Sequence, residues 1–153
     1  MNPILIKPIF RVAGWFLLAL IPLLAVSQHK NKVRFYDKEK TKVHVKYHVL
    51  VNKPHVIDSL YEEFYPNGQL RSMGLYKLNK PVGTWEYYYE NGLVRMKGEI
   101  QNFKNQGRWE YFHENGEKYM EGLLVNGTKE GDWNIYFDNG KIKSKGKFNT
   151  AQE

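Results

Sequence analysis

The sequence predicts an all-β protein: an elongated single antiparallel sheet of successive β-hairpins, preceded by an N-terminal signal-peptide helix. Three observations predict the sheet. A 24-residue unit repeats without insertion or deletion, an Asn-Gly pair recurs at the same position in each unit, and strand-like runs flank each of these pairs. Repeats of this length stack, so that each unit covers the apolar surface of its neighbours. Such stacking produces a long surface, which suits binding better than catalysis.

The first 27 residues have the three-part pattern of a signal peptide. Lys7 and Arg11 form a basic start, residues 12–24 form an apolar stretch of 13 residues, and residues 25–27 read Ala-Val-Ser, with small side chains where signal peptidase cleaves. We expect cleavage between residues 27 and 28 and an exported protein, which is periplasmic, in the outer envelope or secreted.

An uncleaved leader that anchors the chain is the alternative. The apolar stretch is short against the roughly 20 residues that span a bilayer, and Pro22 interrupts it. Both features favour cleavage.

Residues 28–42 are predicted to form a basic linker. Residues 28–53 hold eight Lys or Arg against two acidic residues, a net charge of +6, whereas residues 54–153 hold thirteen basic against fourteen acidic residues. A basic arm can contact anionic lipid headgroups. We therefore expect membrane contact only through this arm or an uncleaved leader. Nucleic acid is not an expected partner, because no regularly spaced aromatic side chains accompany these lysines.

Residues 43–58 are predicted to form a degenerate half-repeat that caps the N-terminal end of the array. Residues 43–49 alternate apolar with polar side chains, as a strand does. At the other end, lysines alternate with other residues from 141 to 148. A charged edge strand discourages further strand pairing, so we expect both ends to be capped.

Residues 59–153 contain four repeats, and each is predicted to be one hairpin. Asn-Gly tolerates positive φ at both central positions, which predicts a two-residue type I′ turn. The segments between hairpins, such as residues 77–83 and 125–131, are predicted to be turns. The eight residues of the Asn-Gly turns are Asn67, Gly68, Asn91, Gly92, Asn115, Gly116, Asn139 and Gly140.

A two-residue turn fixes the residues that lie opposite each other. In the second repeat it pairs Tyr89 with Val94 and Trp85 with Gly98, on a face that is apolar throughout. A three-residue loop with a bulge would shift the pairing by one residue and set charged side chains beside the aromatic ones. The pattern therefore favours the two-residue turn.

Each tryptophan is predicted to cover the glycine opposite it in its own hairpin. Glycine packs nothing, so its bare backbone leaves room for a large ring from the facing strand. Cross-strand aromatic pairs stabilise a sheet by roughly 0.2 to 1 kcal/mol each. The members of this structural column are Tyr61, Gly74, Trp85, Gly98, Trp109, Gly122, Trp133 and Gly146.

The other face carries an aromatic ring in every repeat, and the same register sets a cation beside the ring in three of four copies. Such contacts can be a structural device. The rings can also form a row of platforms that binds a partner protein or a glycan chain. Both interpretations stay open. The candidate binding residues are the opposite pairs Phe64 and Arg71, Tyr88 and Arg95, Phe112 and Tyr119, and Tyr136 and Lys143.

The repeat pattern resembles a known family. Gly-x-Trp is followed by Asn-Gly six residues after the tryptophan, and then by a further glycine, in residues 83–98, 107–122 and 131–146. This pattern resembles the MORN repeat variant of bacterial proteins that are described as YwqK-family antitoxins, and the resemblance covers about residues 59–148. It implies an elongated sheet of hairpins that serves as a protein-interaction or membrane-associated scaffold, and an antitoxin-like protein.

No enzyme, cofactor or metal site is predicted. His44 and His48 share one face of a predicted strand but lie about 13 Å apart, which is too far for both to bind one Zn²⁺. The carboxylates of the repeats lack an apolar pocket that would raise a pKa. No glycine-rich loop opens a helix, and no serine lies in a nucleophile elbow.

Three classes of function follow from these observations. The first is an exported scaffold that binds another envelope or secreted protein through its sheet face. The second is a module that binds cell-wall carbohydrate through its aromatic rows. The third is a peripheral membrane protein.

Overall fold

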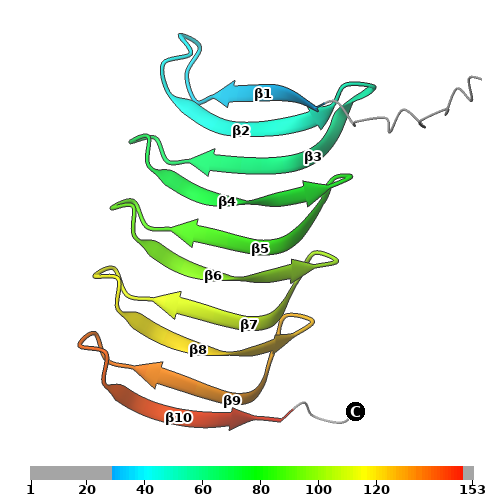
Figure 1. The fold of residues 1–153 in the computed structure, drawn as a ribbon. Helices are drawn as coiled ribbons and strands as arrows, with labels where there is room; N and C mark the ends of the chain where they lie inside the picture. Colours follow the sequence, from blue (N-terminus) through cyan, green and yellow to red (C-terminus); the bar gives the residue numbers. More distant parts are fainter. Residues whose placement is uncertain (1–28, 150–153) are drawn as a thin grey trace, which may run out of the picture.

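The computed structural model describes residues 29–149, which form one ten-stranded antiparallel sheet. Each strand pairs with its neighbours in sequence, so that successive hairpins stack along one axis (Figure 1). The predicted hairpin sheet is confirmed, and the predicted signal peptide lies outside the described residues. The strands are β1 (His29–Phe35), β2 (Val43–Leu50), β3 (Lys53–Phe64), β4 (Leu70–Lys77), β5 (Lys80–Tyr88), β6 (Val94–Gln101), β7 (Lys104–Phe112), β8 (Lys118–Val125), β9 (Thr128–Tyr136) and β10 (Ile142–Phe148).

The N-terminal part of the sheet differs from the prediction. Residues 29–35, which were expected in a basic linker, form β1 and pair with β2 from His29 opposite Leu50 to Phe35 opposite Val43. β2 is therefore the second strand of a fifth hairpin and not a half-repeat. The sequence of this strand is rich in lysine and lacks the apolar alternation that predicts a strand. Charged side chains are common on edge strands, because they discourage further strand pairing.

Asp37 holds the loop of this first hairpin. Its carboxylate accepts hydrogen bonds from the backbone N–H groups of Thr41 (3.0 Å) and Lys42 (2.8 Å). The hydrogen bond from the Thr41 hydroxyl and these backbone bonds lower the pKa of Asp37 to about 2.

The Asn-Gly loops have three residues, not two. In the second repeat the Gly92 N–H donates to the Tyr89 carbonyl (3.0 Å), and the Tyr89 N–H donates to the Leu93 carbonyl (2.8 Å). Gly92 has a φ of +85°, while Asn91 is not among the residues with positive φ. This geometry is a type I turn followed by a left-handed glycine. The expected type I′ turn is therefore wrong.

A bulge beside each loop restores the expected register. Tyr88 lies opposite Val94, but Tyr87 lies opposite Met96, which leaves Arg95 as an extra residue. The pairing of tryptophan with glycine within each hairpin is confirmed, and the pairing of Tyr89 with Val94 is wrong. The corresponding extra residues in the four repeats are Arg71, Arg95, Tyr119 and Lys143.

The links between hairpins are shorter than predicted. β4 ends at Lys77 and β5 begins at Lys80, and the two residues between them have φ values of +52° and +66°, as a type I′ turn requires. The expected turn over residues 77–83 therefore exists, but it ends early, and Gly83 lies inside β5.

Gly83 begins a second kind of bulge. Leu75 lies opposite Val82 and Met73 lies opposite Glu86, so residues 83–85 face Gly74 alone. The φ of +68° at Gly83 makes this arrangement possible. Extra residues bend a strand, and Figure 1 shows the strands strongly curved. The same bulge recurs in β7 and β9.

This bulge decides what each tryptophan covers. A Cβ atom added to Gly98 would lie 2.3 Å from Cδ2 of Trp109, which belongs to the next hairpin. Trp85 covers Gly74 and Trp133 covers Gly122 in the same way. The predicted contact between tryptophan and glycine is confirmed, but the predicted glycine is wrong. Each indole lies over the glycine of the preceding hairpin and not over the one in its own hairpin.

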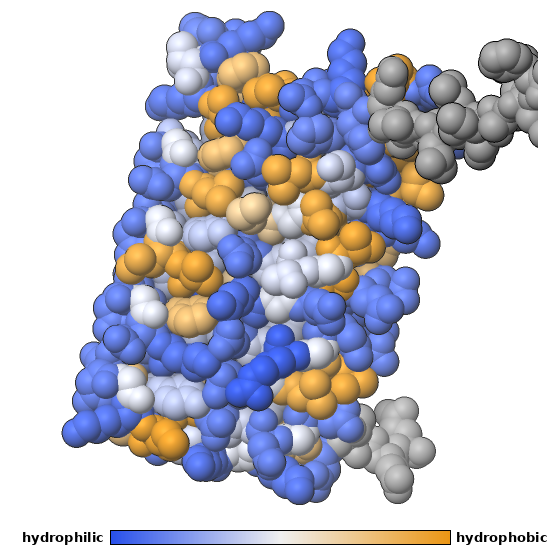
Figure 2. Space-filling view, in the orientation of Figure 1, coloured by the Kyte–Doolittle hydropathy of each residue, from blue (hydrophilic) through white to orange (hydrophobic). Residues whose placement is uncertain are grey.

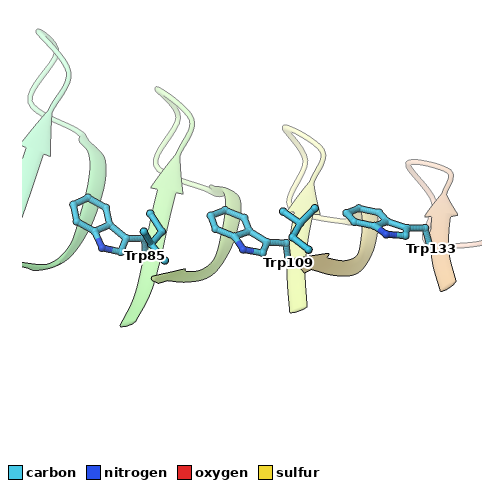
Figure 3. Packing of buried hydrophobic residues seen from close by; sticks show 5 residues of the cluster. Trp85, Trp109 and Trp133 are labelled. Atoms are coloured by element: carbon cyan, nitrogen blue, oxygen red, sulfur yellow. The ribbon is translucent and has the colours of Figure 1, made fainter. Parts of the chain in front are cut away.

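The core of the sheet is the row of indoles that these contacts build (Figure 3). The exposed fractions of Trp85, Trp109 and Trp133 are 5%, 0% and 1%. Ile100 and Leu124 complete this cluster. A single-layer sheet thus buries large side chains because each hairpin covers the next.

Candidate functional site

The tryptophan-bearing face carries a continuous row of half-buried apolar side chains. Tyr87, Met96, Tyr111 and Met120 lie directly opposite one another across β5, β6, β7 and β8. We call these four residues the tyrosine-methionine row. All four pack against the buried core cluster of the three indoles, Ile100 and Leu124. Each of these side chains therefore contacts the core on one side and remains accessible to solvent on the other.

The two tyrosines of the row alternate with the indoles. The ring centroids of Tyr87 and Trp109 are 6.5 Å apart, those of Trp109 and Tyr111 are 6.2 Å apart, and those of Tyr111 and Trp133 are 6.3 Å apart. Equivalent positions repeat every two strands, which is about 10 Å. The packing fixes each tyrosine at this interval.

The four side chains of the row carry no charge at neutral pH, and the nearest cation at its C-terminal end is Lys129, whose ammonium lies 3.9 Å from Sδ of Met120 and 4.4 Å from the centroid of the Trp133 ring. Burial raises the pKa of Tyr87 and of Tyr111 above the ordinary value of 10.0, so both phenols keep their proton. Burial also raises the pKa of Tyr61 and Tyr76, which pack beside Trp85. The surface combines apolar ring and thioether area with phenol groups that can donate hydrogen bonds.

A polar cluster bounds the row at the β3–β4 hairpin. Ser72 lies opposite Tyr87 on the neighbouring strand, and its hydroxyl donates to Glu63 (3.3 Å). The same carboxylate pairs with Arg71 (3.2 Å) and lies 3.5 Å from His44. The tyrosine-methionine row therefore ends at β5, where Ser72 lies opposite Tyr87, although Tyr61 and Tyr76 continue the aromatic packing beside Trp85 on β3 and β4.

The opposite face carries a row of charged side chains. Glu86, Lys97, Glu110 and Glu121 lie opposite one another across β5 to β8. We call these four residues the charged row. Lys97 of the hairpin β5–β6 forms an ion pair with Glu110 of the next hairpin, with an N–O distance of 3.3 Å. The two glutamates that lie opposite each other, Glu110 and Glu121, both bind the ammonium of Lys118 at 2.6 Å.

Glu121 is the most enclosed member of this row, with an exposed fraction of 7%. Besides Lys118, it binds Arg108 at 2.9 Å and accepts a hydrogen bond from the Tyr136 hydroxyl at 2.7 Å. Hydrogen bonds from Lys118, Tyr136 and Arg108 lower the pKa of Glu121 to about 2. The carboxylates of Glu110 and Glu121 are thus paired within the sheet.

The predicted aromatic row lies on this charged face, where its rings pack against neighbouring side chains of the sheet. Phe64, Tyr88, Phe112 and Tyr136 are all half-buried. Lys46 lies over Phe64 at 4.9 Å and Lys97 lies over Phe112 at 5.6 Å. Tyr88 donates to Glu86, and burial together with this bond raises its pKa to about 12.

The predicted partners of these rings are elsewhere. Phe64, Tyr88, Phe112 and Tyr136 lie opposite Leu70, Val94, Lys118 and Ile142, because the bulges displace the expected residues. Arg71 instead lies over Tyr65 at 5.7 Å, Tyr119 meets the edge of His113 at 5.0 Å, and Lys143 lies over Phe137 at 5.6 Å. The eight candidate residues therefore do not form one site.

A ladder of hydrogen bonds joins the Asn-Gly loops, and the sequence analysis missed it. The Asn91 amide donates to the Glu114 carbonyl of the next loop (2.8 Å), and the Tyr89 hydroxyl donates to the Phe112 carbonyl (2.7 Å). Asn67, Asn115 and Tyr65 make the corresponding bonds. The signal was present, since Tyr65 and Tyr89 each precede an Asn-Gly asparagine by two residues.

Neither a metal cluster nor a membrane-spanning helix is found in the part of the chain that the structure describes. Among residues 29–149 no group of three His, Asp or Glu side chains is placed to hold a metal ion. Over the same range no helix is long and apolar enough to cross a membrane.

Three segments of the chain match the family described as MORN repeat variant: residues 58–78, 81–105 and 129–150. In the structure they correspond to the hairpins β3–β4, β5–β6 and β9–β10. The hairpin β7–β8 lies between the matched segments and has the same register and the same bulge. No curated protein matches the sequence.

Proposed function

We propose that this chain, three segments of which match the MORN repeat variant, is a scaffold that binds another protein through the tyrosine-methionine row. The observation that carries this proposal is the row itself: four uncharged, half-buried side chains lie opposite one another across four strands. Tyrosine and methionine are enriched at protein interfaces. Tyrosine offers a large contact area at a small cost in conformational entropy.

The charged face is the weaker candidate for this role. Its carboxylates already bind Lys97, Lys118 and Arg108. A partner would have to replace these bonds or desolvate them, and the cost of burying charges offsets much of the gain. Among residues 29–149, in contrast, the hydroxyls of Tyr87 and Tyr111 make no hydrogen bond within the protein and can bind a partner.

The row also indicates the chemistry of its partner. A row of uncharged side chains, bounded by a polar cluster at Glu63 and Ser72 and by Lys129 beside Met120, selects an apolar segment with a few hydrogen-bond acceptors for the phenols. Methionine adapts its shape to a bound side chain. We therefore expect a protein segment with exposed aliphatic or aromatic side chains.

The compartment of this scaffold is part of the proposal. The signal-peptide pattern of residues 1–27 supports export, and the partner is then another envelope or secreted protein. The family resemblance also implies an antitoxin-like role, which stays a prediction. Export argues against this role, because an exported chain would not meet a cytoplasmic toxin. No catalytic role is proposed.

A photocrosslinking experiment tests the binding face. A photoreactive phenylalanine analogue replaces Tyr87 in one variant and its neighbour Tyr88, on the opposite face, in the other. Both variants are expressed and irradiated in the cells from which the protein comes. We expect a protein adduct from position 87 and none from position 88. A glycan adduct, or a protein adduct from position 88 alone, would contradict the proposal.

A matched pair of variants then tests the row with the purified partner. Serine occupies positions 72 and 144, which are the repeat equivalents of Met96 and Met120, so the repeat accommodates the double substitution Met96→Ser/Met120→Ser. We expect this variant to bind at least tenfold more weakly. The control is Lys97→Met on the charged face, which copies Met73 and should leave binding within twofold. Equal binding by all three proteins would exclude the row, provided that their thermal melts show folded proteins.

A further inference from the structure

The glycine of the last strand lacks the indole that covers the equivalent glycine in the preceding repeats. In the interior of the array Gly74, Gly98 and Gly122 are each covered by the indole of the next hairpin, which would approach an added Cβ to within 2.2 to 2.3 Å. Gly146 occupies the same repeat position in β10, but the nearest atom to its Cβ position is on Phe148, at 3.9 Å. β10 is the edge of the sheet, and every residue of it is exposed.

The charge of this edge is unmatched as well. Lys145 occupies the repeat position of Lys97, which pairs with Glu110 on the next strand at 3.3 Å. Within residues 29–149 no carboxylate forms an ion pair with Lys143, Lys145 or Lys147. The edge strand therefore presents Gly146, over which an aromatic ring can lie, and Lys145, which can pair with a carboxylate.

We propose that β10 is a docking edge for a single antiparallel strand of another protein, which carries an aromatic residue followed by an acidic one. The interior of the array shows the geometry. On β7 the sequence Gly107-Arg108-Trp109-Glu110 places the indole over Gly98 and the carboxylate beside Lys97. A partner strand with the same Gly-x-Trp-Glu order would place its indole over Gly146 and its carboxylate beside Lys145.

Backbone hydrogen bonds would supply much of the affinity, because an edge strand presents unpaired N–H and C=O groups. The aromatic ring and the carboxylate of the partner would determine the register in which its strand pairs with β10. A slip by one residue would set the indole over a lysine-bearing position and move the acid to the other face.

A second copy of this chain does not fit the edge. Its other edge strand, β1, contains Lys30, Lys32 and Arg34 and no tryptophan. Two β10 strands side by side would set lysines against lysines, and like charges directly opposite each other destabilise a sheet. The lysines that were expected to close this end thus exclude further copies and admit an acidic strand. This edge is separate from the tyrosine-methionine row, so each proposal can fail alone.

A peptide with the sequence of β5 tests the docking edge. Residues 80–88 read Lys-Pro-Val-Gly-Thr-Trp-Glu-Tyr-Tyr, and the peptide is neutral when both ends are blocked. Fluorescence anisotropy would measure its binding to the full chain. We expect saturable binding that weakens at least tenfold when the peptide tryptophan is replaced by alanine. No saturable binding, or equal binding of both peptides, would overturn the proposal.

Variants of the chain locate the site. Gly146→Val fills the space above the glycine and should weaken binding at least tenfold. Ser144→Val adds the same side chain two residues away on the same face and should leave binding within twofold. Because both residues lie in an exposed edge strand, thermal melts should show both variants folded. Binding that Gly146→Val does not weaken would mean that the peptide binds elsewhere, which overturns the proposal.

A charge exchange tests the register. Lys145→Glu should weaken binding of the β5 peptide, and replacement of the peptide glutamate by lysine should restore it to within about threefold. Loss without restoration would contradict the proposed pairing of lysine with acid. Sedimentation must also show a monomeric chain at the concentrations used, since a dimer that Gly146→Val abolishes would assign the edge to a second copy.

Discussion

The indole of Trp109 covers Gly98 of the preceding hairpin, although Trp109 lies opposite Gly122 in the ladder of its own hairpin. A Cβ atom at Gly98 would lie 2.3 Å from Cδ2 of the indole, closer than two such atoms can approach. This contact joins one hairpin to the next. The stability of the array therefore depends on a glycine that contributes no side chain of its own.

Replacement of this glycine should destabilise the protein. We expect Gly98→Ala to lower the free energy of unfolding by about 2 kcal/mol or more, because the added methyl displaces a buried indole. Gly146→Ala, at the uncovered end of the same column, should change it by less than about 0.5 kcal/mol. Urea denaturation of both variants measures the difference. Similar values for the two would show that the indole contact is not what requires glycine.

The middle tryptophan should matter more than the last. Trp109→Ala should lower the free energy of unfolding by about 3 to 5 kcal/mol, since it empties a fully buried site between two hairpins. The indole N–H of Trp109 also donates to the Glu99 carbonyl at 3.1 Å, whereas that of Trp133 is buried without a partner. Trp133→Ala should therefore cost less. Thermal melts that show the reverse order would count against the stacked column.

The loop ladder predicts a difference between two asparagines of the same motif. Asn91 accepts a hydrogen bond from the Leu93 N–H (2.9 Å) and donates to the Glu114 carbonyl of the next loop (2.8 Å). Asn139, in the last loop, accepts the corresponding bond from the Lys141 N–H (3.1 Å). No neighbouring loop follows it within the described sheet.

Asn91→Ala should therefore destabilise the protein by about 1 kcal/mol more than Asn139→Ala, the typical contribution of one hydrogen bond. Guanidinium denaturation gives the difference. Hydrogen exchange offers a second readout, because the amides of the loop at residues 113–117 should exchange faster in Asn91→Ala only. Equal costs for the two substitutions would argue against a bond between loops.

The charged face predicts a loss of stability in acid. Hydrogen bonds from Lys118, Tyr136 and Arg108 lower the pKa of Glu121 from 4.5 to about 2 in the folded protein. A lowered pKa means that the carboxylate stabilises the fold above about pH 4.5, and that this contribution is lost as the pH falls towards 2. The hydrogen bond from Lys118 also lowers the pKa of Glu110, which adds to the effect in the same direction.

Glu121→Gln should remove part of this pH dependence. We expect a lower melting temperature at pH 7 and a smaller decrease between pH 4.5 and pH 2 than in the unchanged protein. Glu117→Gln, in an exposed loop, is the control and should melt as the unchanged protein does at both pH values. A decrease of the same size in Glu121→Gln would show that other carboxylates dominate acid unfolding.

The sequence predicts several features of the candidate surfaces and misses others for a common reason. Periodicity correctly places Tyr87 opposite Met96 and Trp85 opposite Gly98, because an apolar face specifies the register of a strand strongly. It places Arg71 opposite Phe64, which is wrong, because the bulge at Arg71 inserts one residue and sends its side chain to the other surface. Positions next to a bulge therefore cannot be assigned from alternation alone.

The sequence by itself determined the repeat, the hairpins and the order of strands, since a 24-residue period with one Asn-Gly loop permits little else. Tertiary structure decided the rest. It alone shows that residues 29–35 form a strand, that each indole covers the glycine of the preceding hairpin, and that Gly146 lacks such a cover. The physical reason is that bulges and sheet edges are set by contacts between hairpins, and a pattern within one hairpin does not contain them.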